Sequence, residues 1–187
     1  SFEEPFLNSG FSTSGIPGWT ASSQNSTGVW VLPAGGFFNA NPPDGRQIGY
    51  TNGTAIAQQT GFAIAAGTQS LTVMAGRRSD GFAGSFRLEL WAGGTVSDGS
   101  VTDGSLLGSS LFDHTLVDPT SWHMLEIEYT ALANDENIGR LVSVRMVKTA
   151  GSQADFDDVR FNGVVPEPAS MVALALGVVA LIARKRR

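Results

Sequence analysis

Short segments in which apolar and polar residues alternate recur through the chain, and they constrain its fold most strongly. Leu71, Val73 and Ala75 share one face of the first clear example. The same pattern recurs at 86–91, 125–129 and 142–147, and residues 155–161 have the composition of a last strand. A period of two is typical of antiparallel strands that turn one face to the core and one to water. No helical periodicity longer than two turns precedes the C-terminal segment.

Glycine-rich and proline-rich stretches separate these segments and predict the turns. Asn52-Gly53 is expected to close a tight hairpin between strands at 47–51 and 54–58, because this pair tolerates positive φ at both central positions. Residues 93–105 and 133–139 are long polar loops. Roughly eight to ten strands joined in this way predict an all-β fold, a two-sheet antiparallel β-sandwich of the jelly-roll type over residues 1–163.

Residues 164–187 differ from the rest of the chain. Val165-Pro166-Glu167-Pro168 cannot lie inside a helix, because each proline lacks an N–H donor and restricts the residue before it. Residues 169–183 are apolar except for Ser170, and Arg184-Lys185-Arg186-Arg187 follow. An apolar segment stopped by cations is typical of a membrane segment with its basic end in the cytoplasm.

The apolar segment is short for a membrane span. A fifteen-residue helix is about 22 Å long, against a hydrocarbon core of roughly 30 Å. By length alone it could be a core helix, but a core helix would not end in four cations. We therefore expect one short transmembrane helix, suited to a segment held only until a protease removes it.

Composition excludes several classes of partner. The 187 residues carry a net charge of −5, but four of the twelve cations lie in the last four residues and one of the seventeen anions is Glu167, so the domain alone carries 8 minus 16, or −8. Such a surface repels nucleic acid and anionic lipid, so we expect no nucleic-acid partner. The chain has no cysteine, which excludes disulfides and thiol nucleophiles. Ser1–Pro5 lacks the features of a signal peptide, so the sequence is expected to begin after a signal or inside the domain.

The C-terminal residues resemble the PEP-CTERM sorting signal of exported bacterial proteins. All three parts are present in order: Val165-Pro166-Glu167-Pro168, the apolar segment and the terminal cluster Arg184, Lys185, Arg186 and Arg187. The resemblance implies an exosortase-type membrane protease as partner, with cleavage near the Pro-Glu-Pro motif. It also implies an intermediate anchored in the inner membrane with its C-terminus in the cytoplasm. Delivery to the cell surface or extracellular matrix would follow.

The domain resembles galactose-binding-like jelly rolls, a fold shared by several carbohydrate-binding modules. The resemblance rests on Ser1–Pro5, Gly18-Trp19, Pro43–Gln47 and Phe156–Phe161. It implies that the domain binds carbohydrate, for example an exopolysaccharide.

The same resemblance implies a structural calcium site that joins the first and last strands through Glu3 and Asp157. Carboxylate oxygens, completed by backbone carbonyls, are suitable ligands for this ion. Asp157 and Asp158 are adjacent and point to opposite faces of a strand, so only one of them can serve the site. The alternative is that these acids are exposed edge charges that discourage pairing between sheets.

Sugar binding would use an exposed aromatic ring. Trp91 is the first candidate, because it shares its strand face with charged residues, and Trp30 and Tyr50 are further candidates. Trp19 and Trp122 lie beside turn residues and are expected to fill the core. The alternative for Trp91 is packing beneath the 93–105 loop, because large aromatic side chains are usually mostly buried.

No sequence motif of a known enzyme class is present. The chain lacks Gly-x-Ser-x-Gly, His-Glu-x-x-His and a phosphate-binding glycine loop. Glu126 and Glu128 share a strand face, which is typical of a solvated surface. We therefore expect no catalytic residue. Two hypotheses remain: a carbohydrate-binding module of an exopolysaccharide matrix, and a structural surface protein without a small ligand.

Overall fold

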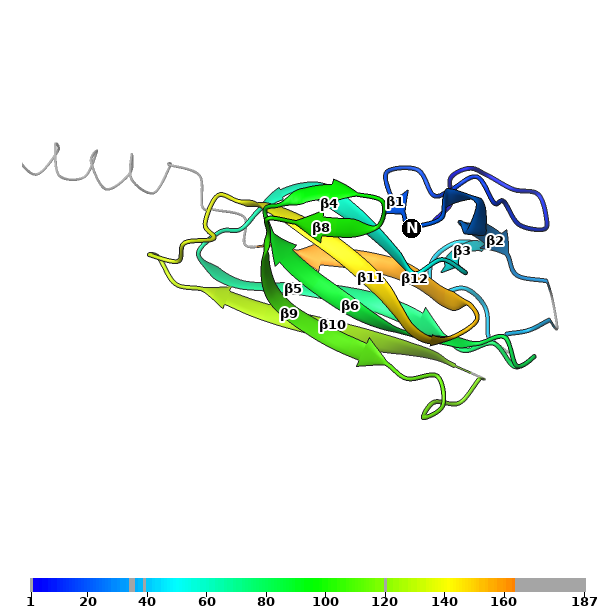
Figure 1. Cartoon of the computed structure of the whole chain (residues 1–187). Coiled ribbons are helices and arrows are strands. Elements are labelled where there is room, and N and C mark those ends of the chain that lie inside the picture. Colours follow the sequence, from blue (N-terminus) through cyan, green and yellow to red (C-terminus); the bar gives the residue numbers. More distant parts are fainter. Residues whose placement is uncertain (1, 34–35, 39, 120, 164–187) are drawn as a thin grey trace, which may run out of the picture.

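A computed structural model describes residues 2–33, 36–38, 40–119 and 121–163 of the chain, which form a two-sheet antiparallel sandwich as predicted (Figure 1). Sheet A contains, in spatial order, β10 (Trp122–Ala131), β5 (Gly67–Gly76), β12 (Ala154–Asn162), β3 (Gln47–Thr51) and β2 (Thr27–Val31). Sheet B contains β1 (Thr20–Ala21), β4 (Ala55–Ala63), β11 (Leu141–Gly151), β6 (Gly84–Ala92) and β9 (Ser105–Phe112). A separate hairpin joins β7 (Thr95–Ser97) and β8 (Ser100–Thr102), and one 3-10 turn, η1, spans Gln24–Ser26.

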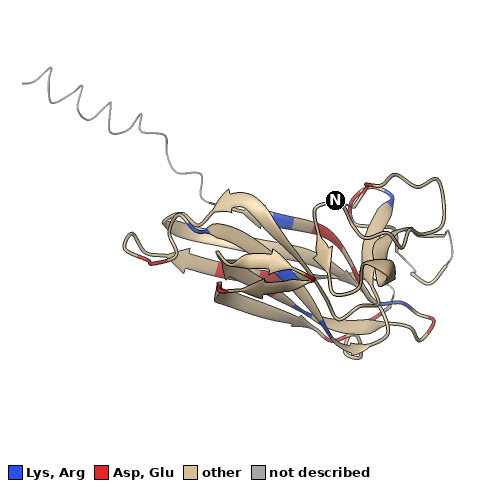
Figure 2. Cartoon of the chain, turned by 45° about the horizontal axis from the view of Figure 1, so that its top comes forward, with Lys and Arg blue, Asp and Glu red and all other residues tan. Residues whose placement is uncertain are grey.

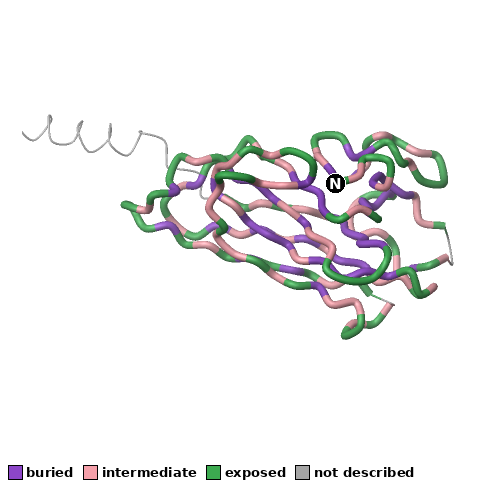
Figure 3. The backbone as a smooth tube through the Cα atoms, viewed as in Figure 1, coloured by how far each residue is buried: buried purple, intermediate pink, exposed green. Residues whose placement is uncertain are grey.

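The main core lies between the two sheets and is built by the alternation that the sequence shows. Leu71, Val73 and Ala75 of β5 lie in one core cluster with alternate residues of β6, such as Leu88 and Leu90, and all five are fully buried. Buried residues therefore follow the strands, while exposed ones gather in the loops (Figure 3).

The predicted hairpin at Asn52-Gly53 is wrong. The strands on its two sides lie in different sheets: β3 pairs with β2 and β12, whereas β4 pairs with β1 and β11. Neither Asn52 nor Gly53 adopts the positive φ that a tight hairpin requires. The Asn52 N–H instead donates to the Ser26 carbonyl at 2.8 Å. The turn thus carries the chain from one sheet to the other.

The 93–105 loop contains the β7–β8 hairpin, which lies over the outer face of sheet B. The Arg145 side chain of β11 donates from Nε to the Gly99 carbonyl at 2.9 Å, which fixes the hairpin tip. Arg145 also contacts the buried Glu89 carboxylate at 3.2 Å. The β7–β8 hairpin therefore covers part of the outer face of sheet B.

Charged residues are sparse on the strands and acidic residues predominate (Figure 2). The residues expected to form a transmembrane helix, 169–183, lie outside the described part of the chain. Within the described ranges, no helix reaches the length and apolar character of a membrane span.

Candidate functional site

A row of directly opposed residues crosses all five strands of sheet A. Its members, from β2 to β10, are Gly28, Tyr50, Asp155, Gly76 and Trp122. Directly opposed residues of antiparallel strands share a face, so the side chains of Tyr50, Asp155 and Trp122 project from the same side of the sheet. That side is the outer face, because Phe156, the neighbour of Asp155, points into the core between the sheets.

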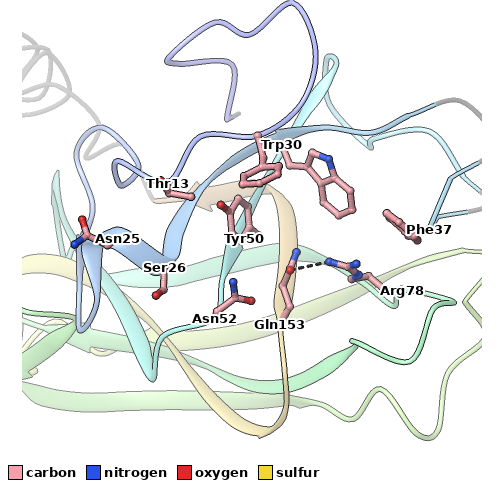
Figure 4. Close-up of a pocket in the computed structure, with 10 residues that line it drawn as sticks. Thr13, Asn25, Ser26, Trp30, Phe37, Tyr50, Asn52, Arg78 and Gln153 are labelled. Carbon is pink, nitrogen blue, oxygen red and sulfur yellow. Dashed lines mark hydrogen bonds between the residues drawn. The ribbon is translucent and has the colours of Figure 1, made fainter.

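A cleft of about 320 Å³ lies beside this row (Figure 4). Four of its lining residues are aromatic, namely Phe11, Trp30, Phe37 and Tyr50, and six are polar, namely Thr13, Asn25, Ser26, Asn52, Arg78 and Gln153. The strands β2 and β3 supply Trp30 and Tyr50, and loops supply Phe11 and Phe37. Aromatic walls with a few polar groups are typical of sites for small organic molecules.

Arg78 is held between aromatic rings at the edge of the cleft. Its guanidinium carbon lies 4.9 Å from the centre of the Trp30 ring and 4.8 Å from that of Phe37. Its Nε donates to the Asp80 carboxylate at 3.0 Å, and this hydrogen bond lowers the pKa of Asp80. Its Nη1 donates to Oε1 of Gln153 at 2.7 Å (Figure 4). The guanidinium therefore has a fixed plane and position.

Arg78 also sets the orientation of the Gln153 side-chain amide toward Asp155. A guanidinium can only donate, so the oxygen of the Gln153 amide faces Arg78 and the nitrogen faces the other way. That nitrogen, Nε2, donates to Oδ1 of Asp155 at 2.7 Å. The other oxygen, Oδ2, is buried and has no hydrogen-bond partner among the described residues.

Burial favours the neutral form of the Asp155 carboxyl group. The side chain is fully buried, and desolvation raises its pKa to about 8, although the Gln153 hydrogen bond and the charge of Arg78 act in the opposite direction. Because Oδ1 accepts the amide N–H, the proton resides on Oδ2. The cleft thus has a protonated carboxyl group behind its wall.

Tyr50 separates Asp155 from the N-terminal segment. Its hydroxyl donates to the Ser12 carbonyl at 2.6 Å, and burial together with the neighbouring Asp155 raises the pKa of the phenol. The phenol therefore stays protonated. The Phe11 ring meets the Tyr50 ring edge-on, with centroids 6.4 Å apart.

Phe38 and Trp122 cover the far end of the row. Their rings are parallel, with centroids 5.3 Å apart. A Cβ at Gly76 would lie 2.6 Å from the Trp122 ring and 2.7 Å from the Phe38 ring, so the stacked pair needs a glycine beneath it. The Trp122 indole Nε1 is buried and, like Oδ2 of Asp155, has no hydrogen-bond partner in the described part of the chain.

The three predicted ligand-binding aromatics lie in two places. Trp30 and Tyr50 line the cleft on sheet A. Trp91 lies on the outer face of sheet B, half-buried, and donates from Nε1 to the Glu89 carboxylate at 3.0 Å. A Cβ at Gly104 would lie 3.3 Å from the Trp91 ring. This is the packing beneath the 93–105 loop that the sequence left open, and sugar binding by Trp91 stays a prediction.

The two predicted calcium ligands contact one loop from two sides. One Glu3 oxygen accepts the N–H groups of Arg46 and Gln47, both at 2.9 Å. Asp157 accepts the N–H of Asp44 at 2.9 Å, and burial raises its pKa to about 6. Among the described residues, no group of three or more His, Asp or Glu side chains is arranged to hold a metal.

Sequence reasoning missed Asp155, Gln153 and Arg78. One signal was present: Asp155 alternates with the core residue Phe156, so a strand at 155–161 must turn this acid away from the core. Nothing in the sequence indicated that Tyr50 and Arg78 would lie beside it.

Two family profiles divide the chain. The profile described as HpiC1 cyclase matches residues 1–162, and the PEP-CTERM protein-sorting motif matches residues 164–187. The second match confirms the predicted sorting signal, which implies export and processing at a membrane by the exosortase system. No curated protein matches the chain.

Solved structures with this fold include enzymes and a protein with a carbohydrate-binding module. A cyclase from Fischerella sp. TAU in complex with 4-(1H-indol-3-yl)butan-2-one has 22% identity and a TM-score of 0.66, over 86% of this chain and 92% of that one. An apo cyclase from Fischerella sp. has 20% identity and a TM-score of 0.65, over 86% and 90%.

The CBM22-1-GH10 modules of a Clostridium thermocellum endo-1,4-β-D-xylanase, complexed with xylohexaose, have 13% identity and a TM-score of 0.50. That similarity covers 84% of this chain and 28% of the xylanase chain. At these identities the structural similarities show the fold alone.

Proposed function

Because the chain belongs to the HpiC1 cyclase family, we propose that its exported sandwich binds a small ring-containing molecule in the cleft of sheet A, with Asp155 as proton donor. The observation that carries this proposal is that Oδ2 of the buried Asp155 has no hydrogen-bond partner among the described residues, while Asp155 lies in the same row as Tyr50 of the cleft wall.

The shape and chemistry of the cleft support a ring as ligand. Trp30 and Phe37 have ring centroids 5.7 Å apart and, with Phe11 and Tyr50, offer flat apolar surfaces. Aromatic and saturated rings both bury area against such faces, and aromatic ligands gain further from edge-to-face contacts. Asn25, Asn52 and Gln153 provide the few polar contacts that orient a ligand.

A neutral carboxylic acid supports acid catalysis of a rearrangement. Asp155 is buried behind the cleft wall, so this step requires a wall side chain to move aside. Asp155 would then donate the Oδ2 proton to an electron-rich carbon or oxygen of the ligand and become a carboxylate. After a bond forms within the ligand, the carboxylate would take a proton back from it. Such a step is an isomerisation and needs no oxidant or reductant. A pKa near the working pH suits a group that gives and regains a proton.

The test uses the full chain in lipid nanodiscs, with empty nanodiscs as the blank. The probe is 4-(1H-indol-3-yl)butan-2-one, whose ketone oxygen can accept the Oδ2–H hydrogen bond. We expect saturable binding by ligand-observed NMR at pH 6 and weaker binding at pH 9, where Asp155 is ionised. Asp155→Asn keeps a donor and loses this pH dependence. Equal affinity of the wild type at pH 6 and pH 9 would contradict the proton-donor role.

Carbohydrate binding is the second candidate. The observation in its favour is that Phe11 and Phe37 are exposed at the mouth of the cleft, where a ring can stack on the apolar face of a pyranose. Trp91 on sheet B remains a separate candidate for the same role. Xylohexaose as the probe distinguishes the candidates: binding that Trp30→Ala abolishes favours the cleft, and binding that Trp91→Ala abolishes favours sheet B. A purely structural role predicts that neither probe binds.

Calcium would join the ends of the domain through Glu3 and Asp157. In support, both carboxylates contact the 44–47 loop, and no Lys or Arg side chain forms an ion pair with either within the described residues. Desolvation of the Asp157 carboxylate favours a bound cation beside it. The ion would tie the N-terminal arm to β12; backbone carbonyls would complete its coordination.

The finer steps of sorting belong to the same proposal. Cleavage near Pro166-Glu167-Pro168 would release the domain from an intermediate that residues 169–183 hold in the inner membrane. Arg184–Arg187 would keep the C-terminus in the cytoplasm. The released domain would then reach the cell surface or an exopolysaccharide matrix.

A further inference from the structure

The end of the sandwich at which β12 ends is formed by three neighbouring chain segments. Ala63 of β4 lies opposite Leu141 of β11, and Ala131 of β10 lies opposite Gly67 of β5. The β4–β5 turn and the β10–β11 loop therefore share one end with Asn162, the last residue of β12 (Figure 1). The aromatic cleft is at the opposite end, because Gly76 of the row is the other terminus of β5.

Exposed large apolar side chains surround this end. They are Phe62, Leu106, Leu132, Ile138 and Leu141, which we call the apolar rim. Leu132 is 69% exposed and Phe62 57%. Single exposed apolar side chains are ordinary in soluble proteins, but five large ones at one end of the domain indicate a contact surface.

The loop that carries part of the rim is held in place. Asp135 accepts the Tyr129 hydroxyl at 2.6 Å and the Asn137 N–H at 2.8 Å. Arg140 donates to the side chains of Ser105 and Asn137 at 2.7 and 3.0 Å. These bonds fix the 132–140 loop on β9 and β10, so Leu132 and Ile138 have defined positions.

The rim adjoins the point at which the chain leaves the sandwich. The Phe62 ring packs on the Phe161 ring, with centroids 5.7 Å apart, and Phe161 lies two residues before Gly163. Five residues, 164–168, separate Gly163 from the apolar segment that starts at Ala169. Five extended residues span at most about 18 Å. A membrane that holds residues 169–183 is therefore within reach of the rim.

We propose that the apolar rim rests in the lipid interface of the membrane that holds the unprocessed sorting signal, so that the sandwich stands end-on with its aromatic cleft directed away from the bilayer. The short tether keeps the rim at a high effective concentration near the lipid, so side chains that bind weakly by themselves suffice. The acidic domain and the exposed Glu136 at this end give no attraction to anionic lipid. The contact is apolar and suits zwitterionic lipid.

The test uses single cysteines, which the cysteine-free chain permits. Leu132→Cys on the rim and Leu116→Cys, at a site 82% exposed in the β9–β10 loop near the cleft end, each carry an environment-sensitive NBD dye. The full chain is placed in nanodiscs of phosphatidylcholine and phosphatidylethanolamine, with a nitroxide-labelled lipid as quencher. Val172→Cys in the apolar segment reports insertion, and melting curves check that each labelled protein is folded.

We expect at least threefold stronger quenching at position 132 than at position 116, unchanged in 0.5 M salt. Equal quenching at the two positions overturns the proposal. So does a dye at position 132 that is shielded from water but not quenched by lipid, because a second copy of the chain then covers the rim. No quenching at position 172 also overturns it, because the apolar segment is then outside the bilayer. None of these outcomes depends on the ligand of the cleft.

Discussion

The amide nitrogen of Gln153 lies 2.7 Å from Oδ1 of Asp155, and this contact selects which carboxyl oxygen carries the proton. Arg78 fixes the other end of the Gln153 amide. The second carboxyl oxygen of Asp155, Oδ2, is buried and has no hydrogen-bond partner among the described residues. A buried polar group left in this way lowers stability, typically by about 1–3 kcal/mol. Such groups are concentrated at functional sites.

The first prediction concerns pH. The pKa of Asp155 is raised from an ordinary value of 3.8 to about 8, so the folded state retains a proton that the unfolded state loses above pH 4. The stability that this group contributes is therefore present below about pH 4 and is lost as pH rises to about 8. The slope approaches about 1.4 kcal/mol per pH unit for one group. Urea unfolding between pH 6.5 and 8 should show it.

Asp155→Asn is the comparison, because it cannot titrate. Its free energy of unfolding should fall less than that of the wild type between pH 6.5 and 8. Asp157 also has a raised pKa, to about 6, so Asp157→Asn should alter the pH dependence mainly below pH 6.5. Parallel pH profiles for the wild type and Asp155→Asn would mean that Asp155 is ionised in the folded protein.

The second prediction concerns the glycine beneath the stacked rings. Gly76→Ala would place a Cβ 2.6 Å from Trp122 and 2.7 Å from Phe38, so at least one ring must move. We expect a loss of about 1–3 kcal/mol in the free energy of unfolding. Gly61→Ala is the matched control, since a Cβ at Gly61 meets nothing within 4 Å and its φ is not positive. A similar change in both variants would contradict the packing role of Gly76.

Several strands of this fold could be predicted because apolar and polar residues alternate along them. The alternation at 86–91, 125–129 and 142–147 marks β6, β10 and β11. The partners of each strand could not be predicted in the same way. Asn52-Gly53 has the composition of a hairpin turn, yet it joins two sheets, because pairing depends on strands distant in sequence.

The candidate site depends on that same pairing. Tyr50 and Asp155 meet only because β3 and β12 are neighbours, which no local pattern shows. Trp91 illustrates the converse: its outward direction could be predicted, but the sequence left open whether the 93–105 loop packs over it. Local periodicity indicates which face a side chain is on, and tertiary contacts decide whether that face stays open.

The third prediction concerns the Arg78 guanidinium, which lies between the Trp30 and Phe37 rings. Arg78→Lys keeps the charge, but an ammonium group cannot stack between Trp30 and Phe37 while bonding to Gln153 and Asp80. We expect the free energy of unfolding to fall by about 1–2 kcal/mol. Arg160→Lys is the control: Arg160 pairs with Asp158 in an exposed ion pair, and its replacement should cost less than about 0.5 kcal/mol. An equal loss in the free energy of unfolding for both variants would argue against a structural role for the stacking of Arg78 between Trp30 and Phe37.

The last prediction concerns calcium. If Glu3 and Asp157 hold an ion, calcium at about 100 times its dissociation constant should raise the free energy of unfolding by about 2.7 kcal/mol, because only the folded state brings the two carboxylates to one loop. Calorimetric melting with calcium and with a chelator measures this shift. Asp157→Asn should abolish it.

Asp158→Asn is the neighbouring control and should keep the shift, because the Asp158 carboxylate forms an ion pair with Arg160. Magnesium should produce a smaller shift than calcium, since it demands near-octahedral geometry and dehydrates reluctantly. A melting temperature that is the same with calcium and with the chelator would contradict the proposed calcium site. Glu3 and Asp157 would then serve as acceptors for the backbone N–H groups of the loop, which they already bond.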